Sequence, residues 1–112
     1  MEELAKVSRE AFVKKMVSHL EVAYSKELRD QVGMVQNPQN FVRGGVKKAM
    51  LYGISYEHDV QLYLECMVEL GSSFDTDPAT PWASKILQNS NLTGEEKMNE
   101  IEEYLTFLAM SK

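Results

Sequence analysis

The chain has 112 residues, 44% of them hydrophobic, and a formal net charge of −5. This length favours a single domain over residues 1–112, large enough for a core but too small for two. No apolar run reaches the roughly 18 to 20 residues of a membrane span, and no basic segment precedes an apolar one as in a secretory signal. The sequence therefore predicts a cytoplasmic protein that does not contact a membrane.

The cysteine content and the charge distribution narrow the class further. One cysteine, Cys66, excludes an internal disulfide and a multi-cysteine zinc site, in agreement with a reducing compartment. Residues 1–56 carry nine Lys or Arg against six Asp or Glu, and residues 57–112 carry three against eleven, giving +3 and −8. A pI near 5.0 argues against nucleic-acid binding. The acidic half can steer a basic protein partner, or it can serve only as a solvated surface.

The first segment predicts a helix after a short lead. Met1–Val7 is expected to be frayed, and Ser8 is a candidate N-cap. Residues 24–33 either continue the helix or start a short second one at Ser25. The apolar stripe of the helix consists of Phe12, Val13, Met16, Val17, Leu20 and Tyr24.

A second helix is expected from Pro38 to Tyr52, with Asn37 as its N-cap and proline at its first position. Its interior contains Gly44 and Gly45, each of which costs about 1 kcal/mol relative to alanine in a helix. Two interpretations of this pair remain. Close approach of a neighbouring helix backbone is favoured, and a hinge is the alternative.

The stretch from residue 52 to residue 83 predicts a central helix with both ends marked. Gly53 is expected to end the preceding helix in a left-handed conformation, and Ser55 to cap the next one. Gly71 is expected to stop this helix after roughly four turns, with Phe74 folding back onto its apolar side. That side consists of Val60, Tyr63, Leu64, Met67 and Leu70.

The loop that follows contains two aspartates. Asp75 and Asp77 match the first ligands of a calcium loop, but Thr80 and Ile86 stand where such a loop needs glycine and glutamate. Both aspartates are instead expected to cap turns. A helix is expected to open after Thr80, and its Trp82 is expected to pack in the core with the indole N–H bonded to a loop carbonyl.

The last helix begins with a capping box, in which the Thr93 hydroxyl serves the Glu96 amide and the Glu96 carboxylate reaches back. No segment shows the strict alternation of a half-buried strand, so the fold class is all-α: a single compact bundle of about five helices. The apolar stripe of the last helix consists of Met98, Ile101, Tyr104, Leu105 and Leu108.

Catalytic and metal sites are disfavoured. The two histidines, His19 and His58, form no metal-binding pair, so no metal or other cofactor is expected. His58 and Cys66 are eight residues apart, roughly 12 Å along one helix, which excludes a direct hydrogen bond. Cys66 is expected to be a small buried or half-buried hydrophobe. A small hydrolase using either residue is the least favoured of three functions.

The function that remains is that of a protein-binding module. The sequence also allows the chain to form a homo-oligomer. Seven methionines provide either core filler, which is favoured, or an adaptable contact surface. The residues expected to contact a partner are acidic and belong to the central helix, the loop after it and the last helix: Glu57, Glu65, Glu69, Asp75, Asp77, Glu100 and Glu103.

Residues 49–98 also carry a family signature, AMLYGISYEHDVQLYLECMVELGSSFDTDPATPWASKILQNSNLTGEEKM. This run resembles a family of small proteobacterial helical proteins that share alanine and YGI, an acidic residue before a DV pair, a methionine and LG, then FD, DP and PWA, then IL and a KM-like ending. The segment from Phe12 to Leu20 resembles the family's start. Members are associated with type VI secretion effector modules, beside spike proteins, adaptor chaperones, toxic effectors and immunity proteins.

The resemblance assigns no chemical role to any residue, but it implies a role for the whole chain. It implies a cytosolic, non-catalytic accessory protein that acts as a co-chaperone or adaptor partner in effector loading. The alternative is an immunity protein that binds its cognate toxin and masks the toxin's active site with the acidic face of residues 95–103. The expected partner is therefore an adaptor chaperone or an effector.

Overall fold

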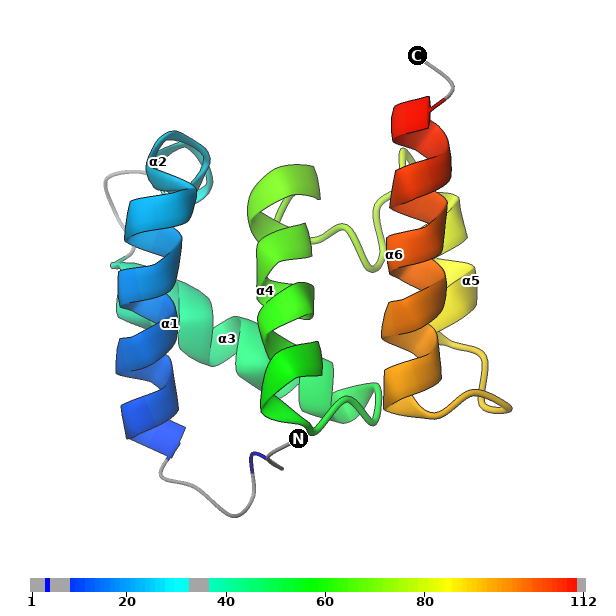
Figure 1. The fold of residues 1–112 in the computed structure, drawn as a ribbon, viewed down its shortest axis with the longest axis horizontal. Helices are drawn as coiled ribbons and strands as arrows, with labels where there is room; N and C mark the ends of the chain where they lie inside the picture. The colour runs from blue at the N-terminus through cyan, green and yellow to red at the C-terminus, as the bar shows by residue number, and fades with distance from the viewer. Residues whose placement is uncertain (1–3, 5–8, 33–36, 111–112) are drawn as a thin grey trace.

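Leu4 and residues 9–32 and 37–110 are the part of the chain that the computed structural model describes (Figure 1). Within that part the chain forms six α-helices and no strand, and its radius of gyration is 13.6 Å. The all-α compact bundle is confirmed, with one helix more than the five expected. The helices are α1 (Arg9–Ala23), α2 (Ser25–Val32), α3 (Pro38–Leu51), α4 (Glu57–Leu70), α5 (Pro81–Leu87) and α6 (Gly94–Met110).

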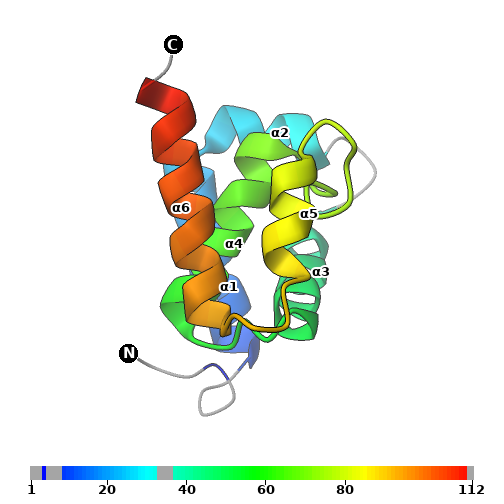
Figure 2. The same ribbon diagram turned by 90° about the vertical axis from the view of Figure 1, so that its right-hand side faces the viewer.

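The helix α4 lies at the centre of the bundle. In Figure 1, α1, α4 and α6 stand side by side, and α3 crosses behind α1 and α4. Figure 2 shows α5 beside α6. Because α4 contacts α1, α2, α3 and α6, most of its surface is enclosed. Its buried side chains are Asp59, Val60, Tyr63, Leu64, Cys66, Met67 and Val68.

The boundary between α1 and α2 answers one question that the sequence leaves open. Ser25 does start a second helix, after a break at Tyr24 alone. The break is small, because the Tyr24 amide donates to the Leu20 carbonyl at 2.8 Å and the Leu28 amide donates to the Tyr24 carbonyl at 2.8 Å. The proposed cap, Ser8, lies outside the described residues.

The expected fraying of the N-terminal lead does not extend to Leu4. Its side chain is buried, and its amide donates to the carbonyl of Ser55 at 2.7 Å. The other residues of that lead lie outside the described part of the chain.

The start of α3 is confirmed. The side chain of Asn37 accepts a hydrogen bond from the Asn40 amide at 2.7 Å, and Pro38 occupies the first turn. The helix ends at Leu51, one residue before the expected end.

The two glycines of α3 have different surroundings. A Cβ on Gly45 would lie 2.5 Å from Leu64 Cδ2 and 2.6 Å from Met67 Sδ, whereas a Cβ on Gly44 would meet nothing within 4 Å. The predicted close approach of a helix backbone is therefore not what the structure shows at Gly45, because side chains of α4 fill the space beside it. Gly44 borders an open hollow of about 310 Å³.

Alanine substitutions at these two positions are expected to have opposite effects. Gly44→Ala should raise the free energy of unfolding by about 0.5–1 kcal/mol, because the alanine restricts the unfolded chain and meets no neighbour. Gly45→Ala should lower it by about 1–3 kcal/mol, because the side chains of Leu64 and Met67 must move. Urea unfolding followed by circular dichroism measures both changes. Equal effects of the two substitutions would contradict this account of the α3–α4 contact.

The connection from α3 to α4 contains one confirmed and one wrong prediction. Gly53 has a positive φ of 80°, as expected for a glycine that ends a helix. Ser55, however, is not the N-cap of α4. The N-cap is Tyr56, with no side-chain hydrogen bond to the helix. Because the helix begins only at Glu57, the Ser55 hydroxyl lies one residue too early to act as the cap.

The end of α4 and the following loop are as expected at three positions. Gly71 has φ 115°, and its amide donates to the Met67 carbonyl. Phe74 is fully buried, with its ring centroid 5.1 Å from that of Tyr63. Asp77 caps a turn by accepting from the Ala79 amide at 2.8 Å.

The helix α5 starts after Thr80 as expected, and Trp82 packs against the hydrophobic core. Its side chain is half-buried and stacks on Tyr104 of α6, with ring centroids 4.4 Å apart. In the described part of the chain, no loop carbonyl is bonded to its indole N–H. Tyr104 lies on the flank of α6 that faces α5, so ring stacking replaces the expected hydrogen bond.

The start of α6 confirms the capping box. The Thr93 amide donates to Glu96 Oε1 at 2.8 Å, and the Glu96 amide donates to Thr93 Oγ1 at 3.1 Å. Lys97, which is almost fully buried, donates to the carbonyl of Tyr52 at 2.8 Å. This bond ties the start of α6 to the end of α3 and uses the only described cation of α6.

Candidate functional site

The seven acidic residues expected to contact a partner do not form one face. Glu57 and Glu65 are half-buried on α4, and Glu69 is exposed near the end of that helix. Asp77 is exposed in the loop. Glu100 and Glu103 are exposed on the outer side of α6. The seventh of these residues is Asp75.

Both predictions for Asp75 are wrong. Its side chain is buried, so it does not face a partner, and it bonds to other side chains in place of capping a turn. Its exposed fraction is 2%, and its carboxylate accepts hydrogen bonds from Lys48 Nζ and from the Tyr52 hydroxyl, both at 2.8 Å. Burial alone raises the pKa of Asp75, but the bonds from Lys48 and Tyr52 outweigh it, so its pKa is lowered overall. Asp75 therefore joins the loop to α3.

Three carboxylates gather where α4 faces α6, and we call Glu65, Glu69 and Glu102 the α4–α6 cluster. Glu102 is half-buried. Its pKa is raised first by burial and then by the negative charges of Glu65 and Glu69, so the three groups lie close enough to repel one another. The cluster therefore concentrates negative charge where α4 faces α6.

The rim of the cluster on the α1 side is polar. His19 Nε2 lies 2.7 Å from Glu65 Oε2, and the Gln61 side-chain amide lies 3.4 Å from the same oxygen. Burial and then the carboxylates of the cluster raise the pKa of Tyr24 to about 12, so this phenol is neutral and can donate a hydrogen bond.

Glu57 lies apart from the cluster, one helical turn before Gln61 on α4. It is 4.0 Å from Lys15 Nζ on α1. A pair of this length with an exposed lysine contributes little to stability.

Glu102 was not among the residues predicted to bind. The sequence does contain a signal for it, because Glu102 is four residues after Met98 and therefore borders the apolar stripe of α6. That position places its carboxylate at the α4 interface. The sequence does not show which residues of α4 meet it there.

The two residues considered for catalysis have different environments. His58 is exposed, whereas Cys66 is buried on the same continuous helix. Burial, together with nearby carboxylates, raises the pKa of the Cys66 thiol, so the thiol stays protonated near neutral pH. Cys66 is a buried hydrophobic side chain, as expected.

The described residues contain no set of three or more His, Cys, Asp or Glu side chains placed to hold a metal ion. Among the described helices, none combines the length and apolar character needed to cross a membrane.

Comparison of the chain with protein-family models, with curated proteins and with solved structures finds no match. The resemblance of residues 49–98 to a known family therefore rests on the sequence alone.

Neutralising Glu102 is expected to stabilise the protein. Because the pKa of Glu102 is raised in the folded state, folding binds protons, and stability falls as the pH rises through the range from the ordinary value of 4.5 to the folded value. At pH 7, Glu102→Gln should therefore raise the free energy of unfolding by about 0.5 kcal/mol, the size of a relieved like-charge contact. Glu103→Gln, on the exposed side of α6, is the control and should change little. Equal effects of the two variants, measured by urea unfolding, would argue against repulsion within the cluster.

Proposed function

We propose that this chain is a non-catalytic, cytosolic protein-binding accessory of a type VI secretion effector module. Its role is that of a co-chaperone or adaptor partner in effector loading. The resemblance of residues 49–98 to the family described above supports the choice of system. The α4–α6 cluster supports the choice of a protein-binding role.

The observation that carries the binding role is the convergence of Glu65 and Glu69 of α4 with Glu102 of α6. Like charges gathered in one place oppose folding, and a cationic partner relieves their repulsion when it binds. The cluster also has groups that can orient a ligand, because the Tyr24 phenol and the Gln61 amide lie at its rim. A basic segment of an adaptor or effector fits this charge.

The surroundings of His58 and Cys66 support a non-catalytic role. A nucleophile and base need hydrogen-bond contact, and an exposed imidazole two turns away from a buried thiol does not provide it.

A second candidate is an immunity protein, favoured by the exposed carboxylates at the start and middle of α6. Glu95, Glu96, Glu100 and Glu103 are all exposed and can cover a basic active site.

One experiment separates the two roles. The toxin encoded beside this chain is produced in the cytosol with and without the chain, and the purified chain is mixed separately with that toxin and with the adaptor chaperone. The accessory role predicts binding to the adaptor and no rescue of growth. Rescue of growth together with a tight binary complex with the toxin would overturn the accessory role and support immunity. Binding to neither protein would overturn both.

A further inference from the structure

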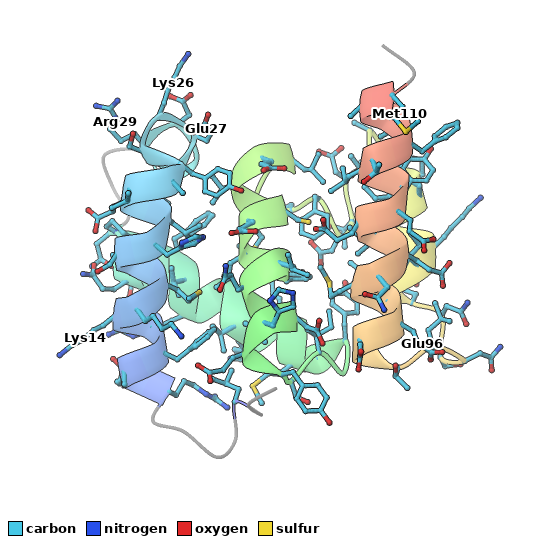
Figure 3. The ribbon with its side chains drawn as sticks, viewed as in Figure 1. Lys14, Lys26, Glu27, Arg29, Glu96 and Met110 are labelled. Carbon is cyan, nitrogen blue, oxygen red and sulfur yellow. The ribbon has the colours of Figure 1, made fainter. Side chains whose placement is uncertain are left out.

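The outer side of α6 carries acidic residues in its first part and apolar residues in its last part. Glu100, Glu103, Phe107 and Met110 are spaced by three, four and three residues, so they form one line along the helix. Phe107 is 63% exposed and Met110 is 79% exposed. Figure 3 places Met110 at the far end of α6 and Glu96 near its start.

The apolar part of this line continues onto α5. Phe107 lies 6.2 Å from Tyr104 between ring centroids, and Tyr104 stacks on Trp82 of α5 at 4.4 Å. Trp82 and Tyr104 are half-buried, so the exposed ring of Phe107 lies beside two rings that are themselves partly packed. We call Trp82, Tyr104, Phe107 and Met110 the aromatic patch. Rigid aromatic side chains of this kind are common anchors in protein interfaces.

The charge beside the patch is negative and uncompensated on α6 itself. Lys97 is the only cation among the described residues of α6, and its ammonium is already bonded to the carbonyl of Tyr52. The carboxylates of Glu100 and Glu103 therefore face solvent without a cation from their own helix.

From this arrangement we infer that the outer side of α6 is a docking surface for an amphipathic helix of a partner protein. Apolar residues of that helix cover Phe107 and Met110, and Lys or Arg residues further along it pair with Glu103 and Glu100. The inference rests on the proposed function, because it specifies the chemistry of the protein partner. It adds a second surface, separate from the α4–α6 cluster, on the other side of α6.

Charge complementarity selects this occupant over two others. If the α6 helices of two copies paired, carboxylates would face carboxylates in a parallel pair, or the apolar patch in an antiparallel pair, and α6 itself supplies no cation to either arrangement beyond Lys97, which is bonded to Tyr52. An anionic membrane surface would be repelled by Glu100 and Glu103. A helix with an apolar part and a basic part satisfies both halves of the surface.

The test uses the full chain and Trp82, the only tryptophan, as the reporter. The probe is a synthetic helical peptide with leucine at helical spacing along one half and lysine along the other. Titration should change the emission of Trp82. The double variant F107A/M110A should weaken peptide binding by at least about tenfold, as expected when two interface anchors are removed. The matched control is V22A/L51A, which removes two apolar side chains that are 86% and 79% exposed on other helices and should bind as the native chain does.

Several outcomes would overturn the inference. Equal weakening by both double variants would show that the patch is not the docking surface. A change in Trp82 emission on addition of phosphatidylglycerol vesicles, with no change on addition of the peptide, would assign the patch to a membrane surface. A dimer in sedimentation experiments that F107A/M110A abolishes would assign it to a second copy.

The docking surface and the accessory role can each be contradicted without the other. If the adaptor binds the native chain and F107A/M110A equally well, the docking surface is wrong and the accessory role stands. If neither adaptor nor effector binds but the peptide does so in a patch-dependent way, the accessory role is wrong and the docking surface stands.

Discussion

Phe74→Ala is expected to lower the free energy of unfolding by about 3–5 kcal/mol, the cost of removing a fully buried phenylalanine side chain. Phe74 has no exposed surface, and its ring packs against Tyr63 of α4 with centroids 5.1 Å apart. Domains of this size are stable by about 5–15 kcal/mol, so the variant should lose a large share of its stability. The substitution should also release the loop between α4 and α5, because Phe74 anchors it.

Urea unfolding monitored by circular dichroism measures this loss. Phe107→Ala is the control, because it removes the same side chain from an exposed position. Its effect should be within about 0.5 kcal/mol, as for other surface substitutions. Similar losses for the two variants would contradict the assignment of Phe74 to the core and Phe107 to the surface.

Asp75→Asn is expected to lower the free energy of unfolding by about 2–3 kcal/mol at pH 7. One carboxylate oxygen of Asp75 accepts a hydrogen bond from Lys48 and the other accepts one from Tyr52. An asparagine amide has only one oxygen, so it cannot replace both acceptors. One donor is left facing the amide nitrogen. Because the Asp75 side chain is 3% exposed and that of Lys48 is 34% exposed, water can reach the lysine but cannot replace the carboxylate.

The same substitution should change the response to acid. The pKa of Asp75 is lowered in the folded state, so its ionised form stabilises the protein above the ordinary value of 3.8, and this contribution is lost as the pH falls through the folded value. The native protein should therefore lose more stability on acidification than Asp75→Asn does. Asp77→Asn is the control, because its side chain is exposed and asparagine keeps the oxygen that caps the turn. An unchanged acid response in Asp75→Asn would contradict the role of Asp75.

Asp75 and Asp77 show what the sequence can and cannot predict. The turn made by Asp77 depends on an amide two residues away, so local chemistry predicts it. The environment of Asp75 depends on Lys48, which is 27 residues away along the chain. No local pattern carries that information. The caps at Asn37 and Thr93 were predictable for the same reason as the turn at Asp77.

For the candidate site, too, the sequence predicts local features but not contacts between distant parts of the chain. The acidic character of α4 and α6 can be read from the sequence, since Glu65, Glu69 and Glu102 lie beside apolar stripes. Their convergence cannot, because it depends on how the two helices are set against each other. The stripe of α4 also does not reveal that Gly45 touches Leu64 and Met67 while Gly44 faces a hollow.

The central claim is that the α4–α6 cluster binds a basic protein of an effector module. Its most direct test is the salt dependence of the dissociation constant for the adaptor chaperone, measured by titration calorimetry with the native chain and with E65Q/E69Q/E102Q. The account predicts that the triple variant is folded, binds at least about tenfold more weakly at low salt and loses most of the salt dependence. Affinity and salt dependence equal to those of the native chain would contradict it.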